Sequence, residues 1–251
     1  MLDLGVLDCT LDEGIARRAA IGLLVLATDQ TMEHEFWSLL HVDGVAVYHA
    51  RLHNDAEITP ETLAAMRPLI APATALILPG TSLDVVAFGC TSASMVLGEE
   101  AVFAEIRKSR PGIAATTPIT AAFAAFRALE ARRIGVLTPY SAAVNERVVA
   151  YLGSHGVEVA AFATFDKADD RDAARIDVAS IARGVHALAR GATLDAVFVA
   201  CTSLRLAEAV EAIETEAGIP VTSSDHALAW HCLRLAGITE PIPGSGRLFR
   251  L

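Results

Sequence analysis

The sequence predicts an α/β protein made of two Rossmann-like domains related by a pseudo-twofold axis, each a four-stranded parallel sheet flanked by helices. Three observations carry this prediction. The chain repeats itself at an interval of about 112 residues, strand-like and helix-like segments alternate within each copy, and 251 residues suit two such units. Strands that alternate with helices form parallel sheets through right-handed crossovers. Because ligands of such sheets bind beyond the carboxyl ends of the strands, we expect the active site in the interdomain cleft.

The internal repeat is a set of short matches that occur in the same order in both halves. Ile21–Leu24 recurs as Ile134–Leu137 at an offset of 113 residues. The segment Cys90-Thr91-Ser92 recurs as Cys201-Thr202-Ser203 at an offset of 111 residues. Ordered matches whose offset drifts slowly indicate two copies of one structural unit.

Short apolar or β-branched runs bounded by turn residues mark the expected strands. They are Ile21–Ala27, Val45–Leu52, Asp84–Cys90 and Ile113–Thr117 in the first unit, and Ile134–Thr138, Val157–Phe165, Ala196–Cys201 and Ile219–Thr222 in the second. The clearest helix is expected over Leu204–Glu216, with an apolar stripe and a Gly218–Pro220 stop. Leu76–Leu78 is expected to end a helix, because its counterpart Ala187–Ala189 continues a helical pattern.

The repeat also predicts the domain boundaries. Residues 1–117 together with 225–251 should form the first domain, and residues 118–224 the second. The final stretch, Asp225–Leu251, has no unit of its own and is expected to pack back on the first domain.

Composition and charge exclude several classes of protein. With 53% hydrophobic and 20% charged residues the chain is not a disordered protein, and no apolar run approaches the roughly 20 residues of a spanning helix. The net charge of −10 is spread along the chain, which argues against a nucleic-acid partner. The acidic N-terminus does not resemble a secretory signal, and four cysteines without a C-x-x-C pair are no disulfide framework. We therefore expect a cytoplasmic protein with no membrane partner.

Cys90 and Cys201 hold equivalent positions at the ends of two buried strands, each followed by Thr and Ser and the expected start of a helix. An unpaired cysteine is most often a small buried hydrophobe. However, the same residue in the same context in both halves favours a reactive pair, because amide groups at a helix N-terminus lower the pKa of a thiol. One thiol should then lie on each side of a substrate bound in the cleft.

Two opposed thiols suit a reaction that needs no cofactor. One thiolate removes a proton next to a carboxylate and the other thiol returns a proton to the opposite face, which racemises or epimerises the substrate. Alternatively, one thiolate adds to an activated double bond, the new single bond rotates, and the thiolate leaves, which gives cis–trans isomerisation.

At this level of detail the chain resembles the aspartate/glutamate racemase superfamily, which includes amino-acid and hydantoin racemases, maleate cis–trans isomerases and arylmalonate decarboxylases. The resemblance rests on the paired Cys-Thr-Ser segments, the two-unit architecture and the stretch Ile21–Glu33, and spans nearly the whole chain after residue 20. Further segments are most similar to the maleate isomerase branch and, within it, to ectoine/hydroxyectoine-utilisation proteins. These are Ala27–Asp29, Asp43–Tyr48, Gly89–Ser94, Val136–Tyr140 and Gly246–Leu251.

The resemblance implies a role for each matching residue. Cys90 and Cys201 correspond to the two catalytic cysteines, and Tyr140 to a tyrosine that contacts substrate in maleate isomerases. The implied substrate-binding residues are Asp29, Gln30, Thr91, Ser92, Tyr140, Thr202 and Ser203. Thr and Ser would hold the substrate carboxylate through hydroxyl and backbone N–H groups. Because the decarboxylase branch carries one cysteine, the presence of both argues against simple decarboxylation.

Asp29 departs from the maleate isomerase pattern, which has Asn at this position, whereas the racemases have an acid there. A carboxylate would repel a dicarboxylate but would orient a thiol or bind an amino group. The sequence therefore puts maleate itself in doubt as the substrate.

The remaining signals favour structural interpretations. His49 and His53 do not share a face in a strand that runs into a loop, so we expect no metal site there, and no cofactor motif is present. Glu33 has two interpretations, a solvated helix start or a residue facing the cleft. Structural positions are expected for Cys9, Cys232, His226 and His231. The alternatives to a two-cysteine isomerase are a one-cysteine lyase or decarboxylase and a small-molecule binding protein. The exposed helices also allow a homo-oligomer.

Overall fold

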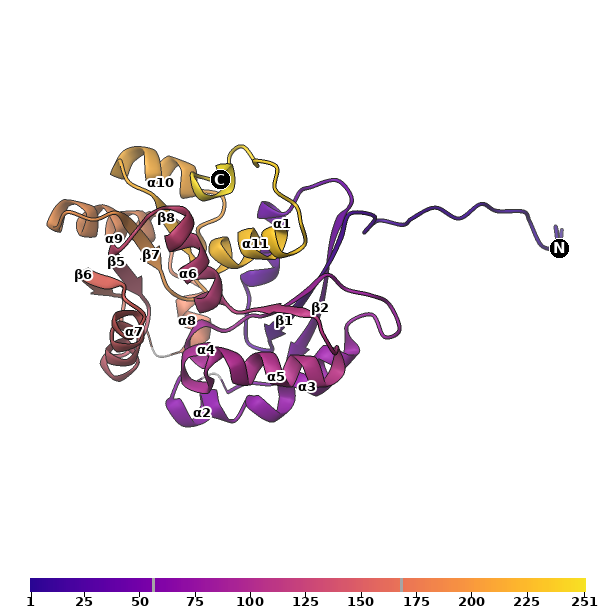
Figure 1. The fold of residues 1–251 in the computed structure, drawn as a ribbon, viewed down its shortest axis with the longest axis horizontal. Helices are drawn as coiled ribbons and strands as arrows, with labels where there is room; N and C mark the ends of the chain where they lie inside the picture. Colours follow the sequence, from indigo (N-terminus) through magenta and orange to yellow (C-terminus); the bar gives the residue numbers. More distant parts are fainter. Residues whose placement is uncertain (56, 168) are drawn as a thin grey trace.

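Two parallel sheets form the framework of the protein. The computed structural model describes residues 1–55, 57–167 and 169–251. The first sheet has the order β2-β1-β3-β4 and the second the order β6-β5-β7-β8, so the two halves share one topology. Figure 1 shows the first sheet beside the helices α2 to α5 and the second sheet surrounded by α7, α9 and α10. The fold class expected from the repeat is confirmed.

Each strand expected from the sequence is present, within a few residues of its expected ends. The strands of the first unit are β1 (Ala19–Leu26), β2 (Val45–Leu52), β3 (Val85–Phe88) and β4 (Ala114–Thr116). Those of the second are β5 (Arg133–Thr138), β6 (Glu158–Thr164), β7 (Ala196–Val199) and β8 (Val221–Ser223). All the pairs between neighbouring strands are parallel, so the carboxyl ends of one sheet lie at one edge.

Helices connect the strands in both units. The first unit contains α1 (Met32–Leu39), α2 (Pro60–Ala64), α3 (Arg67–Leu76), α4 (Thr91–Leu97) and α5 (Glu99–Ser109). Then follow α6 (Pro118–Ala128), α7 (Ala142–Ser154), α8 (Asp170–Ala173), α9 (Val178–Gly191), α10 (Val210–Ala217), α11 (Ser224–Leu235) and a final 3-10 turn, η1 (Leu248–Arg250). Helix α3 ends at Leu76, as its helical counterpart in the second unit indicated. Among the residues described, no helix has the length and apolar character needed to cross a membrane.

The pseudo-twofold relation extends to the packing between strand and helix. Gly22 in β1 and Gly135 in β5 are equivalent, and a Cβ atom at either would meet a leucine side chain, Leu83 at 3.0 Å or Leu194 at 2.8 Å. These leucines are themselves separated by the repeat offset. Only glycine allows this close approach, so the sequence match Ile-Gly at the two positions reflects a shared packing contact.

The C-terminal stretch packs against the first sheet. Buried residues of α11 join those of β1, β3 and α1 in one apolar cluster, and Leu248 and Phe249 complete it. His226 is fully buried in α11 between Thr222 Oγ1 and the carbonyl of Ser245, as expected for a core residue. Figure 1 shows α11 beside α1 and the C-terminus close to α10. The domain boundaries themselves remain a prediction.

The helix expected over Leu204–Glu216 is shorter than the sequence indicated, because α10 begins only at Val210. In a longer helix, the Leu206 N–H would donate to the Thr202 carbonyl. Instead, Leu206 and Ala207 donate to Oε2 of Glu35 at 2.8 Å each, and the Thr202 carbonyl accepts from Thr31 Oγ1 at 2.7 Å. Side chains of the first unit thus satisfy the backbone groups that would otherwise start the helix.

Candidate active site

Cys90 lies between the buried strand β3 and the helix α4. It is the N-cap residue of α4, and its Sγ accepts a hydrogen bond from the backbone N–H of Ala93 at 3.4 Å. Ser92 Oγ lies 3.7 Å from the same sulfur. The thiol is buried, with 5% of the residue exposed. Cys90 therefore has the helix N-terminal setting expected from the sequence.

Cys201 lies beyond the end of β7, at the position equivalent to Cys90, but no helix follows it directly. Its Sγ accepts from the backbone N–H of Ser203 at 3.4 Å, and only 4% of the residue is exposed. The expectation that a helix starts here was wrong, because the next eight residues form turns held by Glu35 and Thr31. A hydrogen bond with the Tyr140 hydroxyl replaces part of the missing helix environment.

Both cysteines line one cavity between the two units. Thr91, Ser92, Tyr140 and Thr202 line it as well, so six of the nine candidate site residues are brought together. The remaining lining residues are Leu26, Asn54, Asp55, Glu57, Ile58, Thr62, Leu63, Met66 and Asp170. The cavity holds about 20 Å³, which is room for roughly one water molecule. Entry of a substrate therefore requires the segments around it to move apart.

Two of these segments meet across the pseudo-twofold axis. Glu57 and Asp169 form an isolated antiparallel bridge, and they are separated by 112 residues, the interval of the repeat. Each precedes a short helix, α2 and α8 respectively. Equivalent loops from the two units thus close the cavity from one side.

Asp170 is a site residue that the sequence did not single out. It is the first residue of α8, is 6% exposed and lines the cavity with both cysteines. Its Oδ2 accepts from Thr28 Oγ1 at 2.7 Å, and its Oδ1 accepts from Ser203 Oγ. The repeat offset places Asp170 opposite Ile58 in the first unit, so no matching residue in the other half drew attention to it.

Asp29 lies in the turn after β1, close enough to influence the site although it does not line the cavity. Its Oδ1 accepts the N–H groups of Thr31 and Met32 at 2.8 Å each. Oδ2 is buried and has no hydrogen-bond partner in the described part of the chain. Burial raises the pKa of Asp29 to about 6, against the lowering effect of the two N–H groups. Gln30, by contrast, is exposed and outside the cavity, because the turn directs consecutive side chains apart.

The environment of the two thiols disfavours the thiolate before a ligand binds. Burial raises the pKa of Cys90 to about 11, and the Ala93 N–H opposes this rise. Burial also raises the pKa of Cys201, where the negative charge of Asp170 is the next largest cause. Cys90 is thus the thiol that ionises more readily.

The hydroxyl groups beside the thiols already have partners. Thr91 Oγ1 donates to Ser224 Oγ at 2.7 Å, and Ser203 Oγ donates to Asp170. The Ser203 N–H points to Cys201 Sγ, so Ser203 positions Asp170 and the thiol here and is not part of the cavity lining. A role in holding a substrate carboxylate stays a prediction for Thr91, Ser92 and Thr202.

The sequence profile of the arylmalonate decarboxylase family matches residues 48–249, which include both cysteines, Tyr140 and Asp170. The chain belongs to the arylmalonate decarboxylase family. Among curated relatives of this family member, maleate isomerase of Nocardia farcinica is 28% identical over 239 residues, covering 92% of this chain and 95% of the relative. Arylmalonate decarboxylase of Bordetella bronchiseptica is 33% identical over 140 residues, or 55% of this chain and 58% of the relative.

Solved structures show the same similarity. A Nocardia farcinica maleate cis-trans isomerase, a cysteine-to-serine mutant with a covalently bound succinylcysteine intermediate, has a TM-score of 0.82 and 28% identity. The match covers 92% of this chain and 98% of that chain. A liganded arylmalonate decarboxylase with a glycine-to-cysteine and a cysteine-to-serine substitution has a TM-score of 0.79, 26% identity and the same coverage. The recognition of the racemase-like superfamily from the sequence is confirmed.

The other residues considered at the sequence level lie outside this site. Glu33 pairs with Arg51 at 2.7 Å and with His49 at 3.0 Å on the surface beside β2, so it does not face the cavity. Within the described ranges, no three His, Cys, Asp or Glu residues form a group suited to a metal ion. Cys9 is exposed and Cys232 is buried in the cluster around α11.

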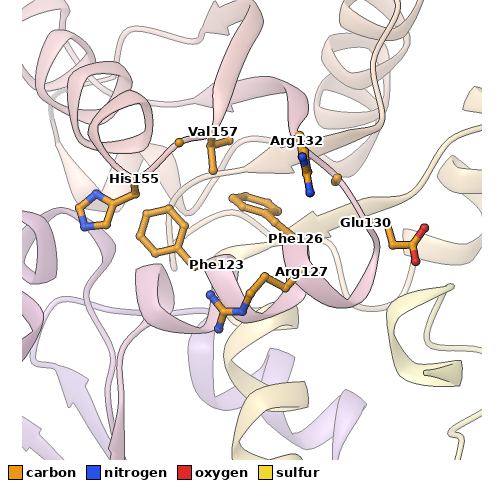
Figure 2. A pocket seen from close by; sticks show the side chains of 9 residues that line it. Phe123, Phe126, Arg127, Glu130, Arg132, His155 and Val157 are labelled. Carbon is orange, nitrogen blue, oxygen red and sulfur yellow. The ribbon is translucent and has the colours of Figure 1, made fainter.

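A larger hollow lies elsewhere on the family member, at the junction of α6 and the start of β6. Figure 2 shows it lined by Phe123, Phe126, Arg127, His155 and Val157, with no cysteine among its side chains. The rings of Phe123 and His155 stack with their centroids 4.8 Å apart, which stabilises this surface. The reactive groups are gathered at the smaller cavity, so that cavity is the candidate active site.

Proposed function

We propose that this protein is a cofactor-independent racemase or isomerase that acts on a small carboxylate with Cys90 and Cys201 as its two catalytic residues. The observation that carries the proposal is that cysteines from equivalent strand ends of the two units line one buried cavity. The relatives that match over nine-tenths of the chain are isomerases by name, which supports the reaction class.

The two thiols have different parts in the proposed reaction. Cys90, the more acidic thiol, removes the proton next to the substrate carboxylate as a thiolate. Cys201 remains protonated and donates its proton to the opposite face of the resulting carbanion, becoming a thiolate. The Tyr140 hydroxyl and the Ser203 N–H then stabilise that thiolate through hydrogen bonds. Exchange of one proton with solvent restores the starting state.

Cis–trans isomerisation is a second candidate, favoured by the similarity to maleate isomerases. Here the Cys90 thiolate would form a C–S bond to one alkene carbon, the former double bond would rotate, and the C–S bond would break again. Cys201 would supply the proton for the adjacent carbon and take it back. A place in ectoine/hydroxyectoine degradation, a cytoplasmic location and self-association remain parts of the proposal that come from the sequence alone.

The test is turnover in deuterium oxide with amino acids, maleate, ectoine and hydroxyectoine as candidate substrates. Racemisation places deuterium on the α-carbon together with inversion. Isomerisation gives the trans product, and decarboxylation releases carbon dioxide. Cys90→Ser and Cys201→Ser are each expected to lower kcat/KM by about 10³-fold or more, because each removes one proton-transfer group. The one-cysteine reaction would survive one of the two substitutions, and a binding protein would show no turnover.

A further inference from the structure

We propose that the substrate carries a cationic nitrogen in addition to its carboxylate, and that Asp170 binds this nitrogen between the two thiols. This inference rests on the proposed function and specifies its substrate class. Three acidic residues line the cavity, Asp55, Glu57 and Asp170, and no Lys, Arg or His is among the described residues around it. A site without a positive side chain suits a zwitterion better than a dicarboxylate.

The carboxylate of Asp170 is held in a fixed orientation by neutral donors from both units. Thr28 of the first unit donates to Oδ2 at 2.7 Å and Ser203 of the second donates to Oδ1. A carboxylate offers about four acceptor positions, so two remain for N–H groups of a ligand. Since the residue is 6% exposed, an ammonium or amidinium group fits these positions better than bulk water does.

Asp29 supplies independent evidence for a missing donor. Its Oδ2 is buried and has no partner in the described part of the chain, and a buried carboxylate oxygen without a hydrogen bond is costly. Asp29 acts electrostatically on both Asp170 and Cys90, so it lies next to the cavity. A cationic nitrogen near Asp170 would offset both negative charges.

The nearest arginine does not supply this charge. Arg51 donates to the carbonyl groups of Leu26, Ala27 and Asp29 and pairs with Glu33 on the surface. Its guanidinium is therefore turned to the outside of the β1 end and does not line the cavity. A dicarboxylate would add two negative charges next to Asp170 without a counter-charge.

The sign of the charge also matters for the thiols. The negative charges of Asp170 and Asp29 disfavour the Cys90 thiolate, and that of Asp170 disfavours the Cys201 thiolate. A bound cation has the opposite effect and favours ionisation of the thiol that starts the reaction. The substrate would in this way activate the thiol, whereas a dicarboxylate would suppress its ionisation further.

Charged methanethiosulfonate reagents test this inference without turnover. The thiolate attacks the reagent, a disulfide forms and methanesulfinate leaves, with either a cationic aminoethyl or an anionic sulfonatoethyl group on the sulfur. The ratio of the cationic to the anionic labelling rate is measured at each cysteine of the full chain by mass spectrometry. Cys9, which is exposed, reports the ratio caused by the overall net charge of −10.

We expect the ratio at Cys90 to exceed that at Cys9 by about 30-fold or more, and Asp170→Asn to reduce this excess about tenfold. Asp172→Asn, an exposed acid on the same short helix, is the matched control and should leave the ratio unchanged. Asp29→Asn should reduce the excess as well, which provides a second variant if Asp170→Asn does not fold.

Equal ratios at Cys90 and Cys9, or a preference for the anionic reagent at Cys90, would overturn the inference, as would an excess that is insensitive to both Asn variants. The wild-type comparison alone decides the first two outcomes. Because labelling needs no substrate, this result is independent of the deuterium experiment, which tests the two-thiol reaction and not the charge of the substrate.

Discussion

The Cys90 half and the Cys201 half contain the same Cys-Thr-Ser segment at the same point of the same topology, yet the chain continues differently. After Cys90, the backbone enters α4 and caps it with the thiol. After Cys201, the backbone forms turns, and Glu35 and Thr31 of the first unit satisfy its polar groups. The comparison teaches that one half provides a more acidic thiol and the other half a better retained proton, although the local sequence is duplicated.

The largest expected effect separates the proton-transfer roles of the two thiols. In Cys201→Ser, inversion of a substrate should fall by about 10³-fold or more, while exchange of the α-proton of one enantiomer with solvent continues within about tenfold of wild type. In Cys90→Ser, that exchange should be lost. Proton NMR in deuterium oxide measures both rates on each enantiomer. The opposite pattern would reverse the assignment of base and acid.

Glu35→Ala should break the contact that distinguishes the Cys201 half. The substitution leaves the buried N–H groups of Leu206 and Ala207 without an acceptor, at about 1–3 kcal/mol for each group. We expect a loss of about 2–4 kcal/mol in the free energy of unfolding, measured by urea denaturation. Glu35→Gln keeps one acceptor oxygen and should lose less. A loss as large for Gln as for Ala would show that the charge, and not the hydrogen bond, holds the turns.

Alkylation by iodoacetamide should reveal the difference between the two thiols in the wild-type protein. The pKa of Cys90 is raised to about 11 and that of Cys201 is raised further, with Asp170 as an additional cause. Between pH 8 and pH 10, we expect both rates to increase with pH and Cys90 to react at least about tenfold faster. Site-resolved mass spectrometry measures the two rates, with exposed Cys9 as a reference for reagent reactivity. Faster labelling of Cys201 would contradict the proposed assignment.

The smallest expected effect concerns Asp225, a fully buried carboxyl at the start of α11 with no hydrogen-bond partner in the described structure. Burial, together with the charges of Asp29 and Glu35, raises its pKa well above the ordinary value. As the pH rises from about 4, the unfolded chain releases this proton before the folded chain does, so the stability of the fold decreases. Asp225→Asn should remove this dependence and add about 1 kcal/mol at pH 8.

Denaturation of Asp225→Asn at pH 5 and pH 8 measures this effect, and exposed Asp8→Asn is the control. An unchanged pH dependence would mean that the carboxyl of Asp225 finds a partner in solution. Asp29, whose pKa is about 6, contributes a dependence of the same sign that ends near pH 6.

The sequence by itself determined the parts of this protein that depend on local patterns. Eight apolar runs became eight strands, and the duplicated Cys-Thr-Ser placed two thiols at equivalent strand ends, because strand burial and topology follow from hydrophobic pattern and crossover length. The matching Ile-Gly pairs likewise reported a packing contact that both units share.

Only the tertiary structure decided which polar groups meet across the two units. Asp170 belongs to a four-residue helix with no sequence signal, and its place beside the thiols follows from hydrogen bonds to Thr28 and Ser203. The apolar stripe after Cys201 predicted a helix from Leu204, but a carboxylate and a hydroxyl from the other unit took its first hydrogen bonds. Hydrophobic periodicity records which face of a segment is buried, whereas such long-range hydrogen bonds depend on residues far apart in the chain.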